Sequence, residues 1–182
     1  MDPQEIWEIY CGEKPVIDIG CGWFNVFEFE YIRFDKASQI CGMKTCADHF
    51  GDFHNMHAFN DNTFAFINAT DVIEHAIDPE KALREWLRIL KIGGVLHVRW
   101  PGLDVWEFEK LLVMNQAVDE DDMPLYFSLG GVPNWIALDQ NGKKFLDVHF
   151  HKISMDFVKK CLDTRVEILA EYPSSLIAKK IF

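Results

Sequence analysis

Apolar and polar stretches alternate along the chain in a pattern that predicts several short, buried strands. Residues 15–19 (PVIDI), 31–34 (YIRF), 64–69 (FAFINA) and 95–100 (VLHVRW) are rich in β-branched and aromatic residues. Runs of this length that are apolar on nearly every position are typical of strands covered on both faces of a parallel sheet. The chain is therefore expected to belong to the α/β class.

Helices are predicted between and around these strands. Residues 2–10 begin with Asp-Pro, an N-cap followed by proline at the first helical position, and residues 78–90 begin in the same way. In the second segment Leu83, Trp86, Leu87 and Leu90 recur at helical spacing, and Gly93-Gly94 is expected to end the helix. Strand, helix and strand at this spacing favour a parallel sheet with crossovers.

The rest of the chain is read in two parts. Residues 154–162 are expected to form a capped helix, and residues 165–170 and 176–181 a closing antiparallel pair of strands. Residues 103–148 are weakly patterned and carry 9 acidic and 3 basic residues. They are interpreted as an insertion or lid within a single domain that spans residues 1–182, because 182 residues correspond to roughly one domain.

Composition excludes some classes of function. The net charge of −11 argues against a general nucleic-acid or anionic-membrane binder, since both require a basic face. No apolar run approaches the ~18 to 20 residues that span a bilayer, and the acidic start does not resemble a signal peptide. The 5 cysteines lack a CxxC pair, which favours reduced thiols over a disulfide framework. We expect a cytoplasmic protein.

Candidate chemistry gathers where the strands end. An α/β sheet binds its ligands outside the carboxyl ends of its strands, and those ends carry Gly20-Cys21-Gly22 and Asp35. A Gly-x-Gly turn allows close backbone approach, although it often only lets a strand meet a helix. A carboxylate after the second strand suits the two hydroxyls of a ribose. Together these features indicate a nucleoside-type cofactor.

At this point the sequence resembles the class I S-adenosylmethionine-dependent methyltransferases, in particular their small type 11-like branch. The resemblance is carried in order by residues 16–22 (VIDIGCG), 51–56 (GDFHNM), 60–64 (NDNTF), 73–75 (IEH) and 85–94 (EWLRILKIGG). It covers about residues 15–102. Residues 149–152 (HFHK) before the last helix are similar to a segment of glycan-pathway relatives, which is a weaker likeness.

The resemblance implies a fold and a cofactor. The fold would be a Rossmann-like, doubly wound, mostly parallel sheet of about seven strands whose last strand is antiparallel. The segment before Asp35 is shorter than in relatives, so the first crossover helix is expected to be short or missing. Trp23-Phe24-Asn25 stands where many relatives have a third glycine. The implied cofactor is S-adenosyl-L-methionine.

Cofactor contacts follow from the resemblance position by position. Gly20 and Gly22 would line the methionine part, Asp35 would hold the ribose, and Asp52 with Phe53 would meet the adenine. Asp71 would lie near the methionine amino end. The complete set of expected cofactor-binding residues is Asp18, Gly20, Cys21, Gly22, Asp35, Asp52, Phe53 and Asp71.

Three histidines are candidate bases for a protonated acceptor. His75 follows Glu74, and a nearby carboxylate raises the basicity of an imidazole. His149 and His151 alternate by two, so an extended backbone would place them on one side. Each of the three has a structural reading as well. A zinc site built from Cys41, Cys46 and nearby histidines has no standard spacing, and no metal is predicted.

The sequence thus predicts an S-adenosylmethionine-dependent methyltransferase that acts on a small-molecule or glycan-linked oxygen or nitrogen acceptor. The alternative is a non-catalytic cofactor-binding or interaction protein with the same fold. A nicotinamide-dependent oxidoreductase is disfavoured, because position 25 is Asn where the longer glycine turn needs Gly. No nucleic-acid or membrane partner is expected, and the oligomeric state is left open.

Overall fold

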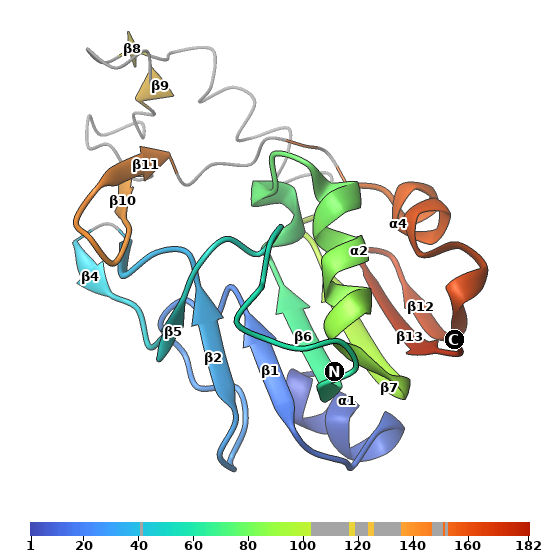
Figure 1. Ribbon diagram of the computed structural model, residues 1–182. Helices are drawn as coiled ribbons and strands as arrows, with labels where there is room; N and C mark the ends of the chain where they lie inside the picture. Colours follow the sequence, from blue (N-terminus) through green and yellow to red (C-terminus); the bar gives the residue numbers. More distant parts are fainter. Residues whose placement is uncertain (41, 103–116, 119–123, 126–135, 147–150, 152) are drawn as a thin grey trace.

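A seven-stranded sheet forms the centre of the computed structural model, with the order β12-β13-β7-β6-β1-β2-β5 (Figure 1). Strands β1, β2, β5, β6 and β7 are mutually parallel, whereas β13 runs antiparallel to both of its neighbours. The predicted Rossmann-like topology is therefore confirmed. The strands of this sheet are β1 (Val16–Ile19), β2 (Ile32–Asp35), β5 (His49–Phe50), β6 (Phe64–Thr70), β7 (Leu90–Arg99), β12 (Val166–Tyr172) and β13 (Ser175–Lys180).

The structure describes residues 1–40, 42–102, 117–118, 124–125, 136–146, 151 and 153–182. Most of the expected insertion or lid at 103–148 lies outside the described residues, as does His149. Within the described part of the chain, no helix is long and apolar enough to cross a membrane.

Helices α1 (Pro3–Tyr10), α2 (Pro79–Ile89) and α4 (Met155–Leu162) begin at the predicted caps. The Asp2, Asp78 and Ser154 side chains each accept a hydrogen bond from a backbone N–H of the first turn. Single-turn 3-10 helices occupy Ile73–His75 (η1) and Asp163–Arg165 (η2).

The end of α2 corrects one expectation. The helix ends at Ile89, and Gly93-Gly94 lies inside β7 instead of terminating the helix. The extended backbone of Leu90 already leaves the helix, and the Lys180 ammonium donates to the Leu87 and Leu90 carbonyl oxygens, both at 2.8 Å. These bonds satisfy carbonyls that a C-terminal glycine motif would otherwise cover.

Two apolar cores lie on opposite faces of the sheet. The larger core packs α2 and α4 on one face, around Trp86 and Leu83. The smaller core packs Ile6 of α1 on the other face, together with Phe27 and Phe66. The helix faces were predictable because each apolar stripe recurs at three and four residues.

No helix joins β1 to β2 in the described residues, as expected from the short segment. A chain segment without regular structure takes this place, and its Phe27, Phe29 and Tyr31 rings pack on one another and on Trp7 of α1. Between β2 and β5 the chain forms a hairpin, β3 (Gln39–Ile40) and β4 (Met43–Lys44).

This hairpin joins part of the region that was interpreted as an insertion. Strands β10 (Ile136–Leu138) and β11 (Lys144–Leu146) extend it to a four-stranded sheet of order β11-β10-β3-β4. Figure 1 shows this small sheet beyond the upper end of β2 and β5. Strands β8 (Ala117–Val118) and β9 (Pro124–Leu125) form a separate pair.

Candidate active site

The carboxyl ends of β1, β2 and β6 bring most of the predicted cofactor residues to one edge of the sheet (Figure 1). Gly20 follows β1 directly, and Asp35 is the last residue of β2. Asp71 follows β6 and adopts a left-handed backbone conformation with φ of 53°. The parallel pairing of these strands places the turns side by side, as the topology predicted.

The glycine turn is shaped by close backbone packing. Gly20 has φ of +72°, and a Cβ atom at this position would lie 2.6 Å from Cγ2 of Val72. Only glycine fits there, because both the conformation and the space exclude a side chain. Gly22 also has positive φ, but a Cβ atom on it would meet nothing within 4 Å. The second glycine therefore borders open space from which a ligand can approach.

The buried carboxylate of Asp35 is joined to this turn. One oxygen accepts a hydrogen bond of 3.0 Å from the Gly22 N–H, and the other accepts one of 2.9 Å from the Ala37 N–H. The Phe34 carbonyl accepts from the Gly20 N–H at 2.8 Å. The end of β2 thus fixes the glycine turn through its backbone and through the side chain of Asp35.

Cys21 lies in the same turn and is buried. Burial, together with the charge of nearby Asp35, raises the pKa of its thiol far above the usual range, so the group stays protonated. Cys46 lies against the turn, because its N–H donates to the Gly22 carbonyl at 2.7 Å. All four described cysteines are free thiols.

Asp18 carries a buried carboxylate within β1, two residues before Gly20. Its Oδ1 accepts a hydrogen bond of 2.5 Å from the Asn68 side chain. Burial raises the pKa of Asp18 to about 7, although the Asn68 bond acts in the opposite direction. Asp18 therefore lies beneath the site and changes its charge near neutral pH.

Asp52 and Phe53 differ in their surroundings. Asp52 is largely exposed, and its Oδ1 lies 2.5 Å from Nδ1 of His54. Partial burial raises its pKa, but the hydrogen bonds from the backbone and ring of His54 outweigh this effect and lower the pKa below the usual value. The Phe53 side chain is buried in the larger core, and its carbonyl accepts from the Trp86 indole at 3.2 Å. Their contact with adenine stays a prediction.

Asp71 forms an ion pair of 2.7 Å with Arg99 at the end of β7. Both side chains are well exposed, and the Asp71 N–H also donates to the Arg99 carbonyl at 2.9 Å. Arg99 was not among the predicted site residues. Its signal in the sequence is its position directly after a buried apolar run, at the edge where the site was expected.

Two of the three candidate bases lie on adjoining segments. Nε2 of His75 is 3.9 Å from the carboxylate of the buried Glu74 in η1. The His151 N–H donates to the Glu74 carbonyl at 3.3 Å, and its Nε2 lies 3.0 Å from the Ile77 carbonyl. A carbonyl oxygen only accepts, so Nε2 of His151 carries a hydrogen atom. Sequence separation of about 75 residues concealed this contact.

The described part of the insertion lies beside Asp35. The Ser38 N–H donates to the Leu138 carbonyl at 2.7 Å, and the Ser38 hydroxyl to the Asp139 carbonyl at 2.7 Å. The Lys36 ammonium lies 4.4 Å from the centre of the Phe145 ring. The hairpin of β10 and β11 is therefore anchored at Ser38, three residues after the predicted ribose ligand.

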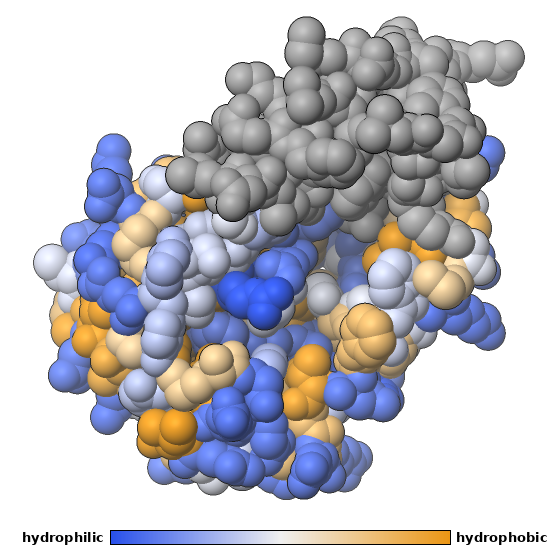
Figure 2. Space-filling model, turned by 180° about the vertical axis from the view of Figure 1, so that it is seen from behind, coloured by the Kyte–Doolittle hydropathy of each residue, from blue (hydrophilic) through white to orange (hydrophobic). Residues whose placement is uncertain are grey.

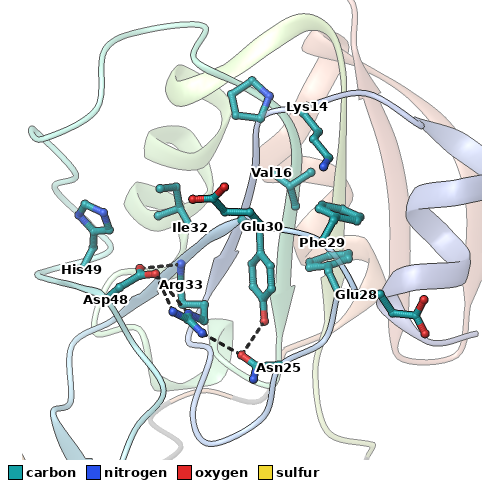
Figure 3. Close-up of a pocket in the computed structure, with 13 residues that line it drawn as sticks. Lys14, Val16, Asn25, Glu28, Phe29, Glu30, Ile32, Arg33, Asp48 and His49 are labelled. Carbon is teal, nitrogen blue, oxygen red and sulfur yellow. Dashed lines mark hydrogen bonds and ion pairs between the residues drawn. The ribbon is translucent and has the colours of Figure 1, made fainter.

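A hollow of about 760 Å³ occupies the sheet face from which the first crossover helix is missing (Figure 3). Val16 and Tyr31 contribute to its lining, and Arg33 stands between Asp48 and Asn25. The Arg33 guanidinium is 3.0 Å from Asp48 and donates to Asn25 at 3.0 Å. This ion pair covers a part of β2 that a helix would otherwise shield.

On the side opposite to Figure 1, the exposed apolar side chains of the described residues do not gather into one large patch. In that view they are separated by polar residues (Figure 2). Within the described residues, His, Cys, Asp and Glu side chains do not group as a metal site would require.

Comparisons with known proteins identify the fold. Residues 17–98 match the family described as "Methyltransferase domain". None of the curated proteins matches the chain. The PH0226 protein from Pyrococcus horikoshii superposes with a TM-score of 0.55 at 16% identity, covering 91% of this chain and 82% of that one.

Two further structures agree. An S-adenosylmethionine-dependent methyltransferase of Thermotoga maritima, a possible histamine N-methyltransferase, gives a TM-score of 0.54 at 18% identity, covering 97% of this chain and 87% of that one. One from Clostridium acetobutylicum gives 0.54 at 17% identity, covering 91% and 83%. These structural matches show the fold of the chain. The chain thus has the Rossmann-like fold of the S-adenosylmethionine-dependent methyltransferases, with a methyltransferase domain match over residues 17–98.

Proposed function

We propose that this protein transfers a methyl group from S-adenosylmethionine to an oxygen or nitrogen atom of a small-molecule or glycan-linked acceptor. The observation that carries the proposal is the hydrogen bond of 3.0 Å from the Gly22 N–H to Asp35, which joins the glycine turn to the acid that ends β2. A turn that a ligand can approach closely, next to a carboxylate suited to a ribose, meets the needs of a nucleoside cofactor.

The residues at this edge fit the cofactor. Open space beside Gly22 leaves room for the methionine part, and two backbone N–H groups hold the Asp35 carboxylate in a fixed orientation for the ribose. Gly20 would line the methionine part as well, and Asp52 with Phe53 would adjoin the adenine. When bound, S-adenosylmethionine supplies an electrophilic methyl group on a positively charged sulfur.

Methyl transfer of this kind depends on placement and on exclusion of water more than on acid-base chemistry. An acceptor that carries a proton also needs a base. We assign this role to His75 and His151, because His75 lies on the segment that follows β6 and His151 is hydrogen-bonded to Glu74 and Ile77 of that segment. In neutral His151, Nδ1 is the nitrogen that can take up a proton, since Nε2 donates to Ile77. His149 stays a candidate from the sequence alone.

Acceptor choice is assigned to the region at 103–148. Support comes from the hairpin of β10 and β11, which is hydrogen-bonded to Ser38 close to Asp35. The acidic composition of this region suits an acceptor that carries a positive charge. One structural neighbour is described as a possible histamine N-methyltransferase, which agrees with a small amine among the candidate acceptors. The glycan-linked class rests on the likeness of residues 149–152.

The test is titration of S-adenosylmethionine and S-adenosylhomocysteine into the pure protein at neutral pH, followed by calorimetry and thermal shift. We expect both ligands to bind, and the Asp35→Ala variant to lose about tenfold or more in affinity, as loss of a charge-assisted hydrogen bond predicts. Asp48→Ala is the matched control, because Asp48 is an acid bonded to Arg33 of the same strand, β2, and lies outside the predicted contacts. Absence of binding to either ligand would overturn the proposal.

A second candidate is a non-catalytic cofactor-binding protein. The observation that favours it is the missing helix between β1 and β2, which removes part of the usual cofactor environment. A panel of amine, hydroxyl and glycan acceptors incubated with methyl-labelled cofactor distinguishes the two. Binding with label transfer supports the enzyme, whereas binding without transfer to any acceptor supports the second candidate.

A further inference from the structure

Four polar side chains lie on four neighbouring strands, three of them in register and the fourth, Ser175, two residues along β13 from the register partner of His97. They belong to Asp18 on β1, Asn68 on β6, His97 on β7 and Ser175 on β13, and all are buried. Asp18 is paired with Asn68 in register, and Asn68 with His97. Buried polar groups of this kind are costly unless they are hydrogen-bonded to one another.

Continuous hydrogen bonds connect them. Asn68 Nδ2 is 2.5 Å from Asp18 Oδ1, Asn68 Oδ1 is 2.7 Å from His97 Nδ1, and His97 Nε2 is 3.0 Å from the Ser175 hydroxyl. The Thr70 hydroxyl also donates to Asn68 Oδ1, at 3.2 Å. We call Asp18, Asn68, His97 and Ser175 the polar chain.

When Asp18 is ionised, the hydrogen bonds of the polar chain can run in only one direction. A carboxylate only accepts, so Asn68 must present its N–H groups to Asp18 and its oxygen to His97. His97 must then donate through Nδ1, and its neutral ring accepts at Nε2 from the Ser175 hydroxyl. Burial, with the charge of Arg99, lowers the pKa of His97 to about 4, which keeps the ring neutral. Every donor therefore points toward Asp18.

Other groups around Asp18 do not supply a compensating positive charge. Asp35 acts on it as a like charge, and Cys21, Cys46 and Tyr31 each feel the charge of Asp18 in return. Arg33 is the register neighbour of Asp18 on β2, but its guanidinium is bound to Asp48. Hydrogen bonds from the polar chain are thus the main stabilisation of the Asp18 anion in the described structure.

We propose that His97 is a positioning residue: through Asn68, it keeps Asp18 oriented and ionised beneath the glycine turn, where the anion favours a positively charged cofactor. This inference rests on the proposed function. S-Adenosylmethionine carries positive charge on its sulfur and on its amino group, and both belong to the methionine part expected beside Gly20 and Gly22. A carboxylate directly under that turn attracts such a ligand, whereas a protonated one does not.

The experiment measures the affinity for S-adenosylmethionine by calorimetry from pH 5.5 to 9. In the wild type, affinity should rise with pH as Asp18 loses its proton. In His97→Leu, the midpoint of this rise should move up by about one pH unit, so that affinity near neutral pH falls up to about tenfold. At pH 9 the variant and the wild type should agree within twofold, because Asp18 is then ionised in both.

Two variants separate positioning from a general structural effect. His97→Asn keeps a donor near the Nδ1 position and should restore the wild-type midpoint. Val95→Ala removes buried volume on the same strand and face, and it should lower the melting temperature without moving the midpoint. An equal loss of affinity at every pH in His97→Leu, or an unchanged midpoint, would overturn the proposal.

A readout without cofactor distinguishes failure of this inference from failure of the proposed function. Carbon-13 NMR of the Asp18 carboxyl in the apo protein should show its titration midpoint higher in His97→Leu than in the wild type. Nitrogen-15 NMR of His97 should show a neutral ring with hydrogen on Nδ1 at neutral pH. An unchanged Asp18 midpoint, or hydrogen on Nε2, would refute the polar chain even if S-adenosylmethionine binds normally.

Discussion

Replacement of Asp18 by Asn should change the pH dependence of folding stability in a direction fixed by burial. Asp18 is only 2% exposed, and the cost of placing its charge in the sheet raises its pKa from 3.8 to about 7. Between these two pH values, the folded protein keeps a proton that the unfolded chain releases. Folding stability due to this group is therefore complete only below the unfolded pKa of 3.8, falls as pH rises, and levels off above pH 7.

The magnitude follows from the two pKa values. A difference between 3.8 and about 7 corresponds to about 4 kcal/mol of unfolding free energy, because one pH unit equals about 1.4 kcal/mol. Asn at position 18 has no proton to lose and escapes this penalty. However, its NH₂ group replaces an oxygen that accepted hydrogen bonds, so a buried donor is left without an acceptor. This costs about 1–3 kcal/mol of unfolding free energy at every pH. The variant should thus be less stable than the wild type at pH 4 and more stable at pH 8.

His97 acts in the opposite direction and makes a difference measurement necessary. Its pKa is lowered from 6.5 to about 4, so the unfolded chain binds a proton that the folded protein refuses between these values. Stability due to His97 therefore rises with pH from about 4 to 6.5 and partly hides the Asp18 effect in the wild type. The same His97 contribution is present in Asp18→Asn, and subtraction of the two curves removes most of it.

The assay is urea denaturation of both proteins from pH 4 to 8, with the unfolding free energy compared at each pH. The difference between variant and wild type should grow by about 4 kcal/mol over this range. Val16→Ala is the control, since it removes buried apolar volume from the same strand and face without touching an ionisable group. A difference curve as level as that of the control would refute the assignment of a raised pKa to Asp18.

Two further predictions concern the support of the site. Gly20→Ala should lower the unfolding free energy, measured by urea denaturation, by about 3 kcal/mol, because the left-handed backbone and the contact with Val72 both resist a Cβ atom. The double variant with Val72→Ala should recover part of this loss. Arg88→Lys should lower the unfolding free energy by about 2 kcal/mol, because a lysine cannot reproduce the guanidinium hydrogen bonds to Glu85 and Asp61. Hydrogen exchange of the amides of residues 56–61 should accelerate, while that of α1 should stay unchanged.

Long apolar runs and helix caps made most of the fold predictable from the sequence. The strands at 16–19 and 64–70, the part of β7 at 95–99 and the starts of the three described helices follow from burial and capping, which are local signals. The two-residue strands β3, β4 and β5 carry no periodicity long enough to detect. The end of α2 was misplaced because Lys180, which caps its carbonyls, lies about 90 residues away in the sequence.

The site was predictable only where it depends on strand ends. Gly20, Gly22 and Asp35 follow strands, so the topology alone brings them together. Asn68 and His97 were not anticipated, because each is a single polar residue within an apolar run. Their pairing depends on strand register, which no local pattern encodes.

The missing first crossover helix changes how the glycine turn is held. In a doubly wound fold, the helix after the first strand ordinarily fixes this turn and directs its positive end toward the ligand. Here the turn is fixed by Asp35 from one side and by the Cys46 N–H, which donates to Gly22, from another. These contacts come from β2 and from the segment after β4, which flank the hairpin of β3 and β4, so these two segments take over a structural role of the helix. Because β3 pairs with β10, the 136–146 segment is hydrogen-bonded to the stretch of chain between the two contacts that hold the glycine turn. Under the proposed function, substitutions in the 136–146 segment should therefore change cofactor affinity as well as acceptor choice.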